Sequence, residues 1–356
     1  MKSAWIWFLS IAGACMLAAA FAAVLPGAAQ PQNRLFFQIS TGTAGGTYFP
    51  MGELLAGIIS HPPGNSRCQT AGVCGPSGLI ASTRTSEGAV ANVYAVNSGA
   101  VDSGLTQADV VADAVKGTGV FARTGAQKHL RVIAALFPED LHLLAGAKSK
   151  IAHIADLKGK RVALGAPNSG TLVTAREVLA AFRISERTIK PSFDTADVAA
   201  RKLESGELDA VFFIGGTPVP LVEELLSRGS ATLVPIAGDG IKRLAKSAPA
   251  LEPSVIAPGT YPRTGRVETV STCSLWVVND SEPNDIVFGI AQALFNPANR
   301  ATLDEGHLSA RLIRLDTAAR NLPAPLHPGA EFYYRKVGKL PLALDPAVPV
   351  KPKPRP

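Results

Sequence analysis

Residues 35–59 read LFFQISTGTAGGTYFPMGELLAGII, and this stretch carries the pattern on which the fold prediction rests. An apolar, β-prone run at 35–40 is followed by a glycine-rich turn at 41–47. Pro50 then suits the first turn of a helix, where its missing N–H is not needed. Apolar residues next recur at helical spacing, at Met51, Leu54, Leu55, Ile58 and Ile59. The stretch therefore predicts a strand, a turn and a helix over about residues 50–60.

The same order of strand, turn and helix recurs along the chain. The pattern predicts further strands at 79–84, 102–106, 161–165, 189–193, 209–214, 232–237 and 267–278. It predicts helices at 89–98, 107–116, 171–182, 196–205, 219–227 and 285–295. Two apolar runs at 130–137 and 141–145 are separated by Pro138. Such alternation predicts an α/β fold in which helices flank parallel sheets.

Length and composition favour a globular protein with two lobes. The chain has 356 residues, more than one domain usually contains, and 47% of them are hydrophobic. The formal net charge is +7, but Lys and Arg are dispersed, apart from the short basic tail at 351–355. Basic and aromatic residues are not interleaved as they are in an RNA-binding sheet, which argues against a nucleic-acid-binding protein.

The two ends of the chain read differently from its middle. Lys2, an apolar stretch over 5–25 and the small residues Gly27-Ala28-Ala29 are typical of a secretory signal peptide at 1–29. An uncleaved membrane anchor is the alternative, because the stretch is long enough to span a bilayer. Cleavage before Gln30 predicts a periplasmic protein. The last residues, 340–356, contain six prolines, and a disordered tail is expected there.

Three cysteines follow the predicted signal peptide. Cys68 and Cys74 lie six apart in a loop rich in Gly, Pro and Ser, and an oxidising compartment favours a disulfide between them. A metal site is the competing interpretation, but this spacing with one nearby histidine, His61, does not match a zinc pattern. Cys273 lies in an alternating apolar run and is expected to be a buried free thiol.

Three glycine-rich turns, at 42–48, 168–171 and 215–218, lead from a strand into a helix. Ligands of open α/β sheets bind at the carboxyl ends of the strands, and the following helix offers free N–H groups and a partial positive charge. The turns therefore predict a pocket that accepts a carboxylate or a phosphate without a basic side chain. Arg84, Arg176 and Arg263 are the alternative sources of positive charge. The expected ligand-binding residues of the turns are Ala44, Gly45, Gly46, Thr47, Tyr48, Ser169, Gly170, Thr171, Gly215, Gly216 and Pro218.

The sequence predicts no catalytic site, cofactor or metal. None of the turns matches a Walker loop, a dinucleotide fingerprint or a nucleophile elbow. The six histidines are scattered, and His142 is interpreted as a core or hinge residue rather than a base. Glu139 and Asp140 are neighbours at the break between two apolar runs, and we interpret them as solvated or hinge-bonded.

The turns and several shorter motifs resemble the TAXI family, the solute receptors of one class of TRAP transporters. The resemblance runs over residues 35–335 in family order. It rests on the motifs at 39–52, 85–92, 98–99, 104–109, 138–142, 156–162, 168–171, 206–212, 215–218 and 259–262. The chain departs from the family at 86–89, where Ser-Glu-Gly-Ala replaces Thr-Gly-Gly-Ser, and the loop at 68–74 resembles an insertion.

The resemblance implies a two-lobed fold of the periplasmic binding protein type, a type II-like Venus flytrap, with the ligand in the cleft between the lobes. Lobe 1 is then 33–138 plus 263–338 and lobe 2 is 139–262, with crossings near 137–141 and 262–268. It adds Asn92 and Gln107 to the expected site. It also implies a monomeric receptor for a glutamate-like amino acid, a 2-oxoacid or a dicarboxylate, with TRAP membrane subunits as partners.

Two other functions use the same architecture. A periplasmic sensor that feeds a membrane kinase would bind its ligand in the same way, and the sequence does not separate it from a transport receptor. A periplasmic enzyme is disfavoured because the turns offer only residues that bind rather than react.

Overall fold

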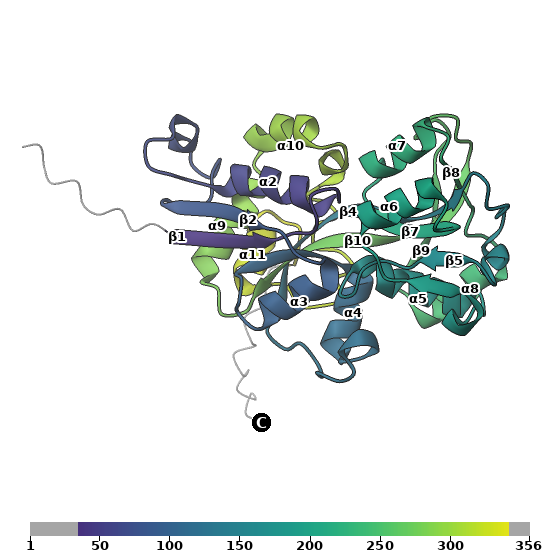
Figure 1. Cartoon of the computed structure of the whole chain (residues 1–356). Helices are drawn as coiled ribbons and strands as arrows, with labels where there is room; N and C mark the ends of the chain where they lie inside the picture. Colours follow the sequence, from purple (N-terminus) through teal and green to yellow (C-terminus); the bar gives the residue numbers. More distant parts are fainter. Residues whose placement is uncertain (1–34, 342–356) are drawn as a thin grey trace, which may run out of the picture. The chain divides into compact units, whose positions relative to one another are not determined.

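A computed structural model describes residues 35–341 of the chain, which belong to one structural unit (Figure 1). The predicted signal peptide and all but the first two residues of the predicted tail lie outside the described residues. Within 35–341, no helix combines the length and the apolar character that a membrane crossing requires.

Ten strands form one mixed sheet in the order β2-β1-β3-β10-β4-β7-β5-β6, with β8 paired to β4 and β9 paired to β10. The strands are β1 (Leu35–Ser40), β2 (Leu79–Arg84), β3 (Ser103–Gln107), β4 (Leu130–Gly146), β5 (Arg161–Ala163), β6 (Lys190–Ser192), β7 (Ala210–Gly215), β8 (Ala231–Leu233), β9 (Glu252–Ile256) and β10 (Val267–Asn279). The pairs β1–β2, β1–β3, β5–β6 and β5–β7 are parallel, as the strand–helix alternation predicts.

Six helices surround the strands β1 to β3: α2 (Tyr48–Ile59), α3 (Ala89–Asn97), α4 (Ala108–Lys116), α9 (Asn284–Leu294), α10 (Arg300–Gly306) and α11 (Pro328–Lys336). Four helices surround β5 and β7: α5 (Gly170–Ala181), α6 (Ala196–Ser205), α7 (Pro220–Ser227) and α8 (Asp239–Ser247). Short 3₁₀ turns lie at Ser66–Gln69, Gly119–Phe121, Ile154–Leu157, Glu186–Thr188, Pro297–Asn299 and Leu308–Leu312.

The long antiparallel strands β4 and β10 connect the two halves (Figure 1). The two apolar runs on either side of Pro138 belong to one strand, because β4 continues through the proline. On one side, Pro138 of β4 lies opposite Cys273 of β10, next to a shift in the register of the two strands. On the other side, β4 pairs with β7 only from Asp140 onward. A proline has no N–H to donate, so it is tolerated at such an irregular position with one unpaired side.

The buried side chains form separate clusters in the two halves. One cluster surrounds Trp276 and Met51 in the half that contains β1 to β3. In the other half, Phe212 packs on one face of β7 and Phe213 packs on the opposite face, in two further clusters. This alternation follows from the two-residue period of a strand that is covered by helices on both faces. The chain therefore has the expected two-lobed α/β fold.

We propose a position for the second crossing that differs from the expected one. Strand β9, which the sequence did not predict, pairs with β10 from Val267 to Ser271. Val270 also packs in a cluster of the second half. We therefore propose that β10 leaves lobe 2 near residue 271 rather than at 262–268, and that residues 263–271 belong to lobe 2.

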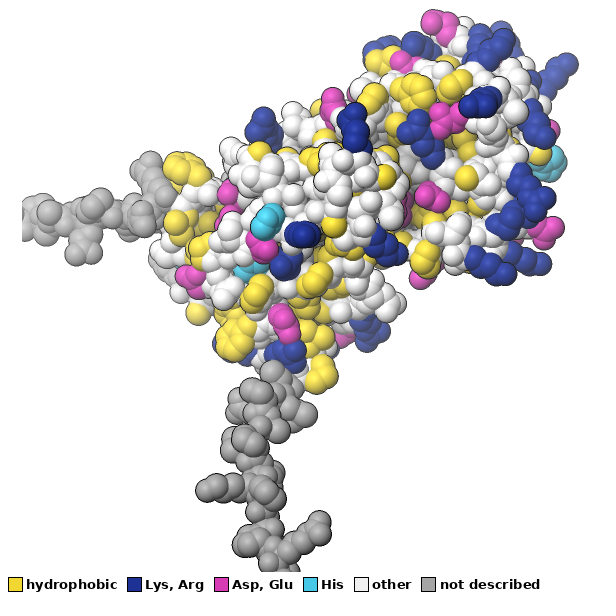
Figure 2. Space-filling model, turned by 90° about the horizontal axis from the view of Figure 1, so that it is seen from below, with side chains coloured by type: hydrophobic (Ala, Val, Ile, Leu, Met, Phe, Trp, Pro, Cys, Tyr) yellow, Lys and Arg dark blue, Asp and Glu magenta, His cyan; other side chains and the backbone are white. Residues whose placement is uncertain are grey.

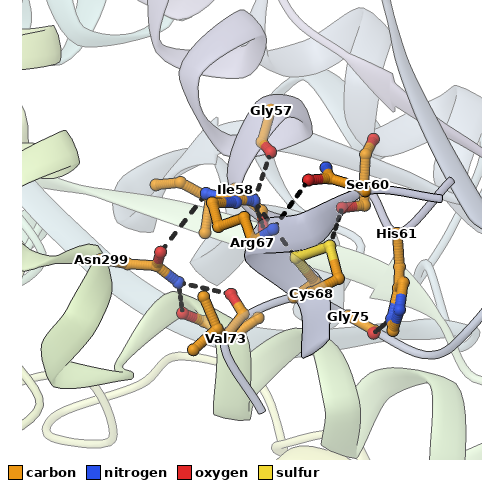
Figure 3. Close-up of a disulfide and its surroundings, with 12 residues drawn as sticks. Gly57, Ile58, Ser60, His61, Arg67, Cys68, Val73, Gly75 and Asn299 are labelled. Atoms are coloured by element: carbon orange, nitrogen blue, oxygen red, sulfur yellow. Dashed lines mark hydrogen bonds between the residues drawn. A yellow bond between two sulfur atoms is a disulfide. The ribbon is translucent and has the colours of Figure 1, made fainter. Parts of the chain in front are cut away.

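The predicted disulfide between Cys68 and Cys74 is present, with a Cα–Cα distance of 5.2 Å (Figure 3). Arg67, next to Cys68, donates 2.9 Å hydrogen bonds to the carbonyl oxygens of Gly57 and Ile58 in the last turn of α2. The loop therefore satisfies carbonyl groups that the end of a helix leaves without partners. Cys273 is a free thiol, as predicted, but it is half-buried rather than buried, and partial burial raises its pKa to about 11.

Candidate functional site

A cavity of about 90 Å³ lies where the strands of both halves end and their helices begin. Its lining residues are Gly42, Thr43, Gly46, Thr47, Tyr48, Glu87, Gly88, Ala89, Gln107, Glu139, Gly165, Ala166, Ser169, Gly170, Thr171, Asp194, Thr195, Ala196, Ala199, Phe212, Phe213 and Ile214.

Four helices begin at this cavity. The first residues of α2, α3, α5 and α6 are Tyr48, Ala89, Gly170 and Ala196, and all four line it. The first N–H groups of a helix have no partner within the helix and carry a partial positive charge. The cavity therefore offers oxygen atoms of a ligand N–H groups from the starts of α2, α5 and α6. In α3, the N–H groups of Val90 and Ala91 already donate to the carbonyl oxygen of Asn168.

Seven of the expected ligand-binding residues line the cavity: Gly46, Thr47, Tyr48, Gln107, Ser169, Gly170 and Thr171. Six others do not: Ala44, Gly45, Asn92, Gly215, Gly216 and Pro218. Ala44 and Gly45 are exposed beside the cavity. The backbone N–H of Gly216 donates to the hydroxyl of Thr47, so the turn at 215–218 contacts the other half instead of the cavity.

Asn92 has a structural role in this arrangement. Its amide donates 2.6 Å hydrogen bonds to the carbonyl oxygens of Thr41 and Leu105, and its oxygen accepts one from the hydroxyl of Ser40. These bonds tie α3 to the ends of β1 and β3. Asn92 is fully buried, and its side chain is satisfied without a ligand.

Ser169 lines the cavity, but its hydroxyl is already engaged. The hydroxyl accepts a hydrogen bond from the N–H of Leu172 and donates one of 2.7 Å to the carbonyl of Ala166. Ser169 is thus the N-cap of α5. What this residue presents to a ligand is the start of the helix rather than a free hydroxyl.

Gln107 is the clearest unsatisfied group at the cavity. Its side chain is 1% exposed, and neither its amide nitrogen nor its oxygen has a hydrogen-bond partner among residues 35–341. A Cβ atom at Gly170 would lie 1.3 Å from the amide oxygen of Gln107, so the Gln107 side chain would have to move to admit one. A buried amide without partners is costly, and a bound solute can satisfy it.

Glu139 is a cavity residue that the sequence analysis did not assign to the site. It is 2% exposed, so the interpretation as a solvated carboxylate is wrong and the hinge-bonded interpretation is the correct one. The hydroxyl of Tyr48 donates a 2.6 Å hydrogen bond to its Oε2 atom. Burial raises the pKa of Glu139 to about 8; the Tyr48 hydrogen bond opposes the rise, and Asp109 and Asp140 add to it.

Two neighbouring carboxyl groups lie behind the cavity. Asp140 accepts a 2.7 Å hydrogen bond from Ser254. Asp109 accepts one of 2.7 Å from Thr174, which belongs to the other half. Burial raises the pKa of Asp109 to about 6, although its hydrogen bond from Thr174 lowers it. The hinge region thus holds three carboxyl groups near one another.

His142 lies in β4 beyond these carboxyl groups, as the prediction of a core or hinge residue requires. It is fully buried, and its Nε2 atom lies 2.8 Å from the hydroxyl of Tyr261. Burial lowers its pKa to about 4, so the ring is neutral at neutral pH. Within the described range, no group of three or more His, Cys, Asp or Glu side chains is arranged to hold a metal ion.

The charged residues that line the cavity are all acidic: Glu87, Glu139 and Asp194. Glu87 accepts a 2.7 Å hydrogen bond from Asn168, and Asp194 pairs with Lys202 at 2.8 Å. Arg84, Arg176 and Arg263 do not line the cavity, and neither does any other lysine or arginine of residues 35–341. Figure 2 shows Lys and Arg side chains gathered on the outside of the half that contains α5 and α8.

A model of the NMT1-like family matches residues 39–338 of the chain. The structure of PhnD1 from Prochlorococcus marinus in complex with methylphosphonate is similar, with a TM-score of 0.51 and 13% identity over 86% of this chain and 99% of that chain. MatC from Rhodopseudomonas palustris with bound malate gives a TM-score of 0.49 and 14% identity over 86% and 97%. The alkanesulfonate-binding protein SsuA from Xanthomonas axonopodis pv. citri, bound to MOPS, gives 0.44 and 18% over 86% and 84%. At these identities the likeness concerns the fold alone.

Proposed function

Because this chain belongs to the NMT1-like family, we propose that it is an extracytoplasmic receptor that binds a small carboxylate-bearing solute and delivers it to a TRAP membrane transporter. The solute is a glutamate-like amino acid, a 2-oxoacid or a dicarboxylate. The delivery partner rests on the resemblance to the TAXI family described above.

One observation carries the proposal of a carboxylate ligand: four helices begin at a single small cavity, and two of them come from each half. A carboxylate oxygen there receives N–H donors and the positive ends of several helix dipoles. The amide of Gln107, which is buried and has no hydrogen-bond partner in the described part of the chain, adds a further donor.

The contacts between the halves support a receptor that works by closing. The carbonyl oxygen of Asn168 accepts hydrogen bonds from the N–H groups of Val90 and Ala91, at 3.1 and 3.2 Å. Thr47 accepts one from Gly216, and Asp109 accepts one from Thr174. A solute that touches both halves favours this closed state over an open one.

A thermal-shift screen of the mature protein tests the solute class. The panel is L-glutamate, 2-oxoglutarate and L-malate, with methylphosphonate and a neutral sugar for comparison. A carboxylate present at about 100 times its dissociation constant stabilises the folded state by about 2.7 kcal/mol. Stabilisation by the sugar alone, with no response to any anion, contradicts the proposal.

Delivery is tested separately. Proteoliposomes that contain the TRAP membrane subunits from the same genome should take up the radiolabelled solute only when this receptor is added outside. Equal uptake without the receptor, for a solute that the receptor binds, contradicts the assignment of a TRAP partner and leaves the binding function in place.

A further inference from the structure

Glu139 stands apart from the other acidic residues of the cavity. Glu87 has an amide partner and Asp194 has a lysine partner, whereas Glu139 is held only by the hydroxyl of Tyr48, through Oε2. No residue within 35–341 forms a hydrogen bond with its other oxygen, Oε1. Because Glu139 lines the cavity, Oε1 is the atom that remains for a solute.

The surroundings of Glu139 disfavour a negative charge at this position. The titratable groups that face it are Tyr48 of α2, Asp109 of α4, Asp140 of β4 and Cys273 of β10, none of which is cationic. No lysine or arginine of the described chain lines the cavity to neutralise it. A buried carboxylate without a cationic partner gains a proton instead of remaining charged.

We propose that Glu139 is an uncharged carboxyl group in the closed state and donates a hydrogen bond from Oε1 to an oxyanion of the solute, so that binding takes up one proton. In the open state the group is solvated and ionised at neutral pH. On closure it takes its proton from the solvent, Tyr48 donates to Oε2, and the acid proton lies on the oxygen that faces the solute. This inference rests on the proposed carboxylate solute.

The burial of Glu139 supports the direction of this coupling. In the closed arrangement its pKa is raised to about 8, whereas a solvated glutamate has a pKa of about 4.3. A bound anion raises the value further, because it also disfavours a second negative charge. At a pH between the pKa of the open state and the pKa of the closed state, Glu139 therefore holds its proton only when the lobes close on the solute.

Isothermal titration calorimetry tests the proposal with 2-oxoglutarate and L-glutamate as probes. These solutes differ in that an ammonium group of the amino acid replaces the keto oxygen, and neither titrates between pH 6.5 and 8. Titrations in buffers of different ionisation enthalpy give the number of protons taken up. We expect about one proton per 2-oxoglutarate near pH 7.5, and an affinity that falls by up to about tenfold per pH unit as the pH rises.

Variants of Glu139 separate a donor from a carboxylate. Glu139→Gln keeps an N–H donor, so it should lower the affinity for 2-oxoglutarate by no more than about tenfold while proton uptake disappears. Glu139→Leu has no donor, and it should lose about a hundredfold or more. Glu282→Gln is the matched control, because burial also raises the pKa of Glu282, to about 7, but it lies outside the cavity. Its proton uptake should match the wild type.

Three results would overturn the proposal. One is binding of either probe without proton uptake by the wild type, and another is proton uptake that persists in Glu139→Gln. The third is binding of L-glutamate alone, with Glu139→Gln as damaging as Glu139→Leu, because an ionised Glu139 then pairs with the ammonium group. These results leave the receptor function intact. A failure of every carboxylate to bind the wild type contradicts the proposed function itself.

Discussion

The hydroxyl of Thr174 donates a 2.7 Å hydrogen bond to Oδ2 of Asp109, and this bond joins α5 in one half to α4 in the other. Both side chains are buried. Asp109 has a further, longer contact of 3.4 Å with the hydroxyl of Thr272 in β10. The bond therefore exists only when the halves are together, and it stabilises the closed state rather than either half alone.

Removal of this hydroxyl should weaken solute binding without unfolding the protein. Thr174→Val leaves the Asp109 carboxyl without its best donor in the closed state, a loss of about 1–3 kcal/mol. We expect the dissociation constant of the bound carboxylate to rise by about 5- to 150-fold. Calorimetry measures it, with Thr232→Val, at an exposed position of β8, as the control. Equal affinities in the two variants would show that the bond contributes nothing to closure.

Stability of the solute-bound, closed protein should depend on pH through Glu139. Its folded pKa, about 8, is raised above the value of an unfolded glutamate, about 4.3. The folded state therefore holds a proton that the unfolded state has released, and this contribution is present at low pH and lost as the pH rises through about 8. Relative to Glu139→Gln, the wild type should lose on the order of 1–4 kcal/mol of unfolding free energy between pH 5 and 8.

Urea unfolding at pH 5, 6.5 and 8, in the presence of saturating 2-oxoglutarate, measures this difference. Other titrating groups, such as Asp109 and His142, are common to both proteins and cancel to first order in the comparison. A difference that stays constant across the range would mean that Glu139 has an ordinary pKa in the folded protein.

The disulfide should stabilise the fold without affecting the cavity. It closes a ring over a sequence separation of 6, and the loss of its constraint on the unfolded chain costs about 2 kcal/mol. The double variant Cys68→Ser, Cys74→Ser should lower the unfolding free energy by that amount in urea titrations. Solute affinity should not change, because the loop packs at the last turn of α2 and the cavity lies at its first turn. A large loss of affinity in this variant would link the loop to the site.

The sequence was sufficient to predict the strand–turn–helix units and where their helices begin. Each unit shows a local signal: an apolar run, a glycine-rich turn, then apolar residues at helical spacing. The turn at 42–48 and the turn at 168–171 accordingly contribute to one cavity. The sequence of strand β9, EPSVI, contains no apolar run that would predict a strand. The strand forms because β10 offers a free edge with which it can pair.

The roles of individual side chains depended on contacts that no local pattern contains. Glu139 and Asn92 are both polar residues in apolar surroundings, yet one lines the cavity and the other is satisfied by backbone carbonyls. Glu139 bonds to Tyr48, which lies 91 positions away in the sequence. Asn92 bonds to Thr41, which lies 51 positions away. A polar residue at the centre of the long apolar run 130–145 was the one available signal for Glu139.

Gly170 provides the sharpest test of closure by steric means. Gly46 is less suitable, because a Cβ there would meet the carbonyl oxygen of Thr43 at 3.4 Å and its hydroxyl at 3.7 Å, which is tolerable. A Cβ at Gly170 would overlap the amide of Gln107 and lie 3.1 Å from the Cβ of Ala89, both in the other half. Gly170→Val should therefore hold the halves apart and abolish both solute binding and the decrease in radius of gyration.

Small-angle X-ray scattering with and without the solute measures that decrease. Gly57→Ala is the control, because an added Cβ at this exposed helix position meets no atom within 4 Å, and it should close like the wild type. Far-ultraviolet circular dichroism should show that both variants fold, since Gly170 is the first residue of α5 and Leu172, Ala175 and Val178 of that helix pack in a cluster of their own half. If the Gly170→Val protein binds the solute and contracts like the control, the first turn of α5 does not face Gln107 in the bound state.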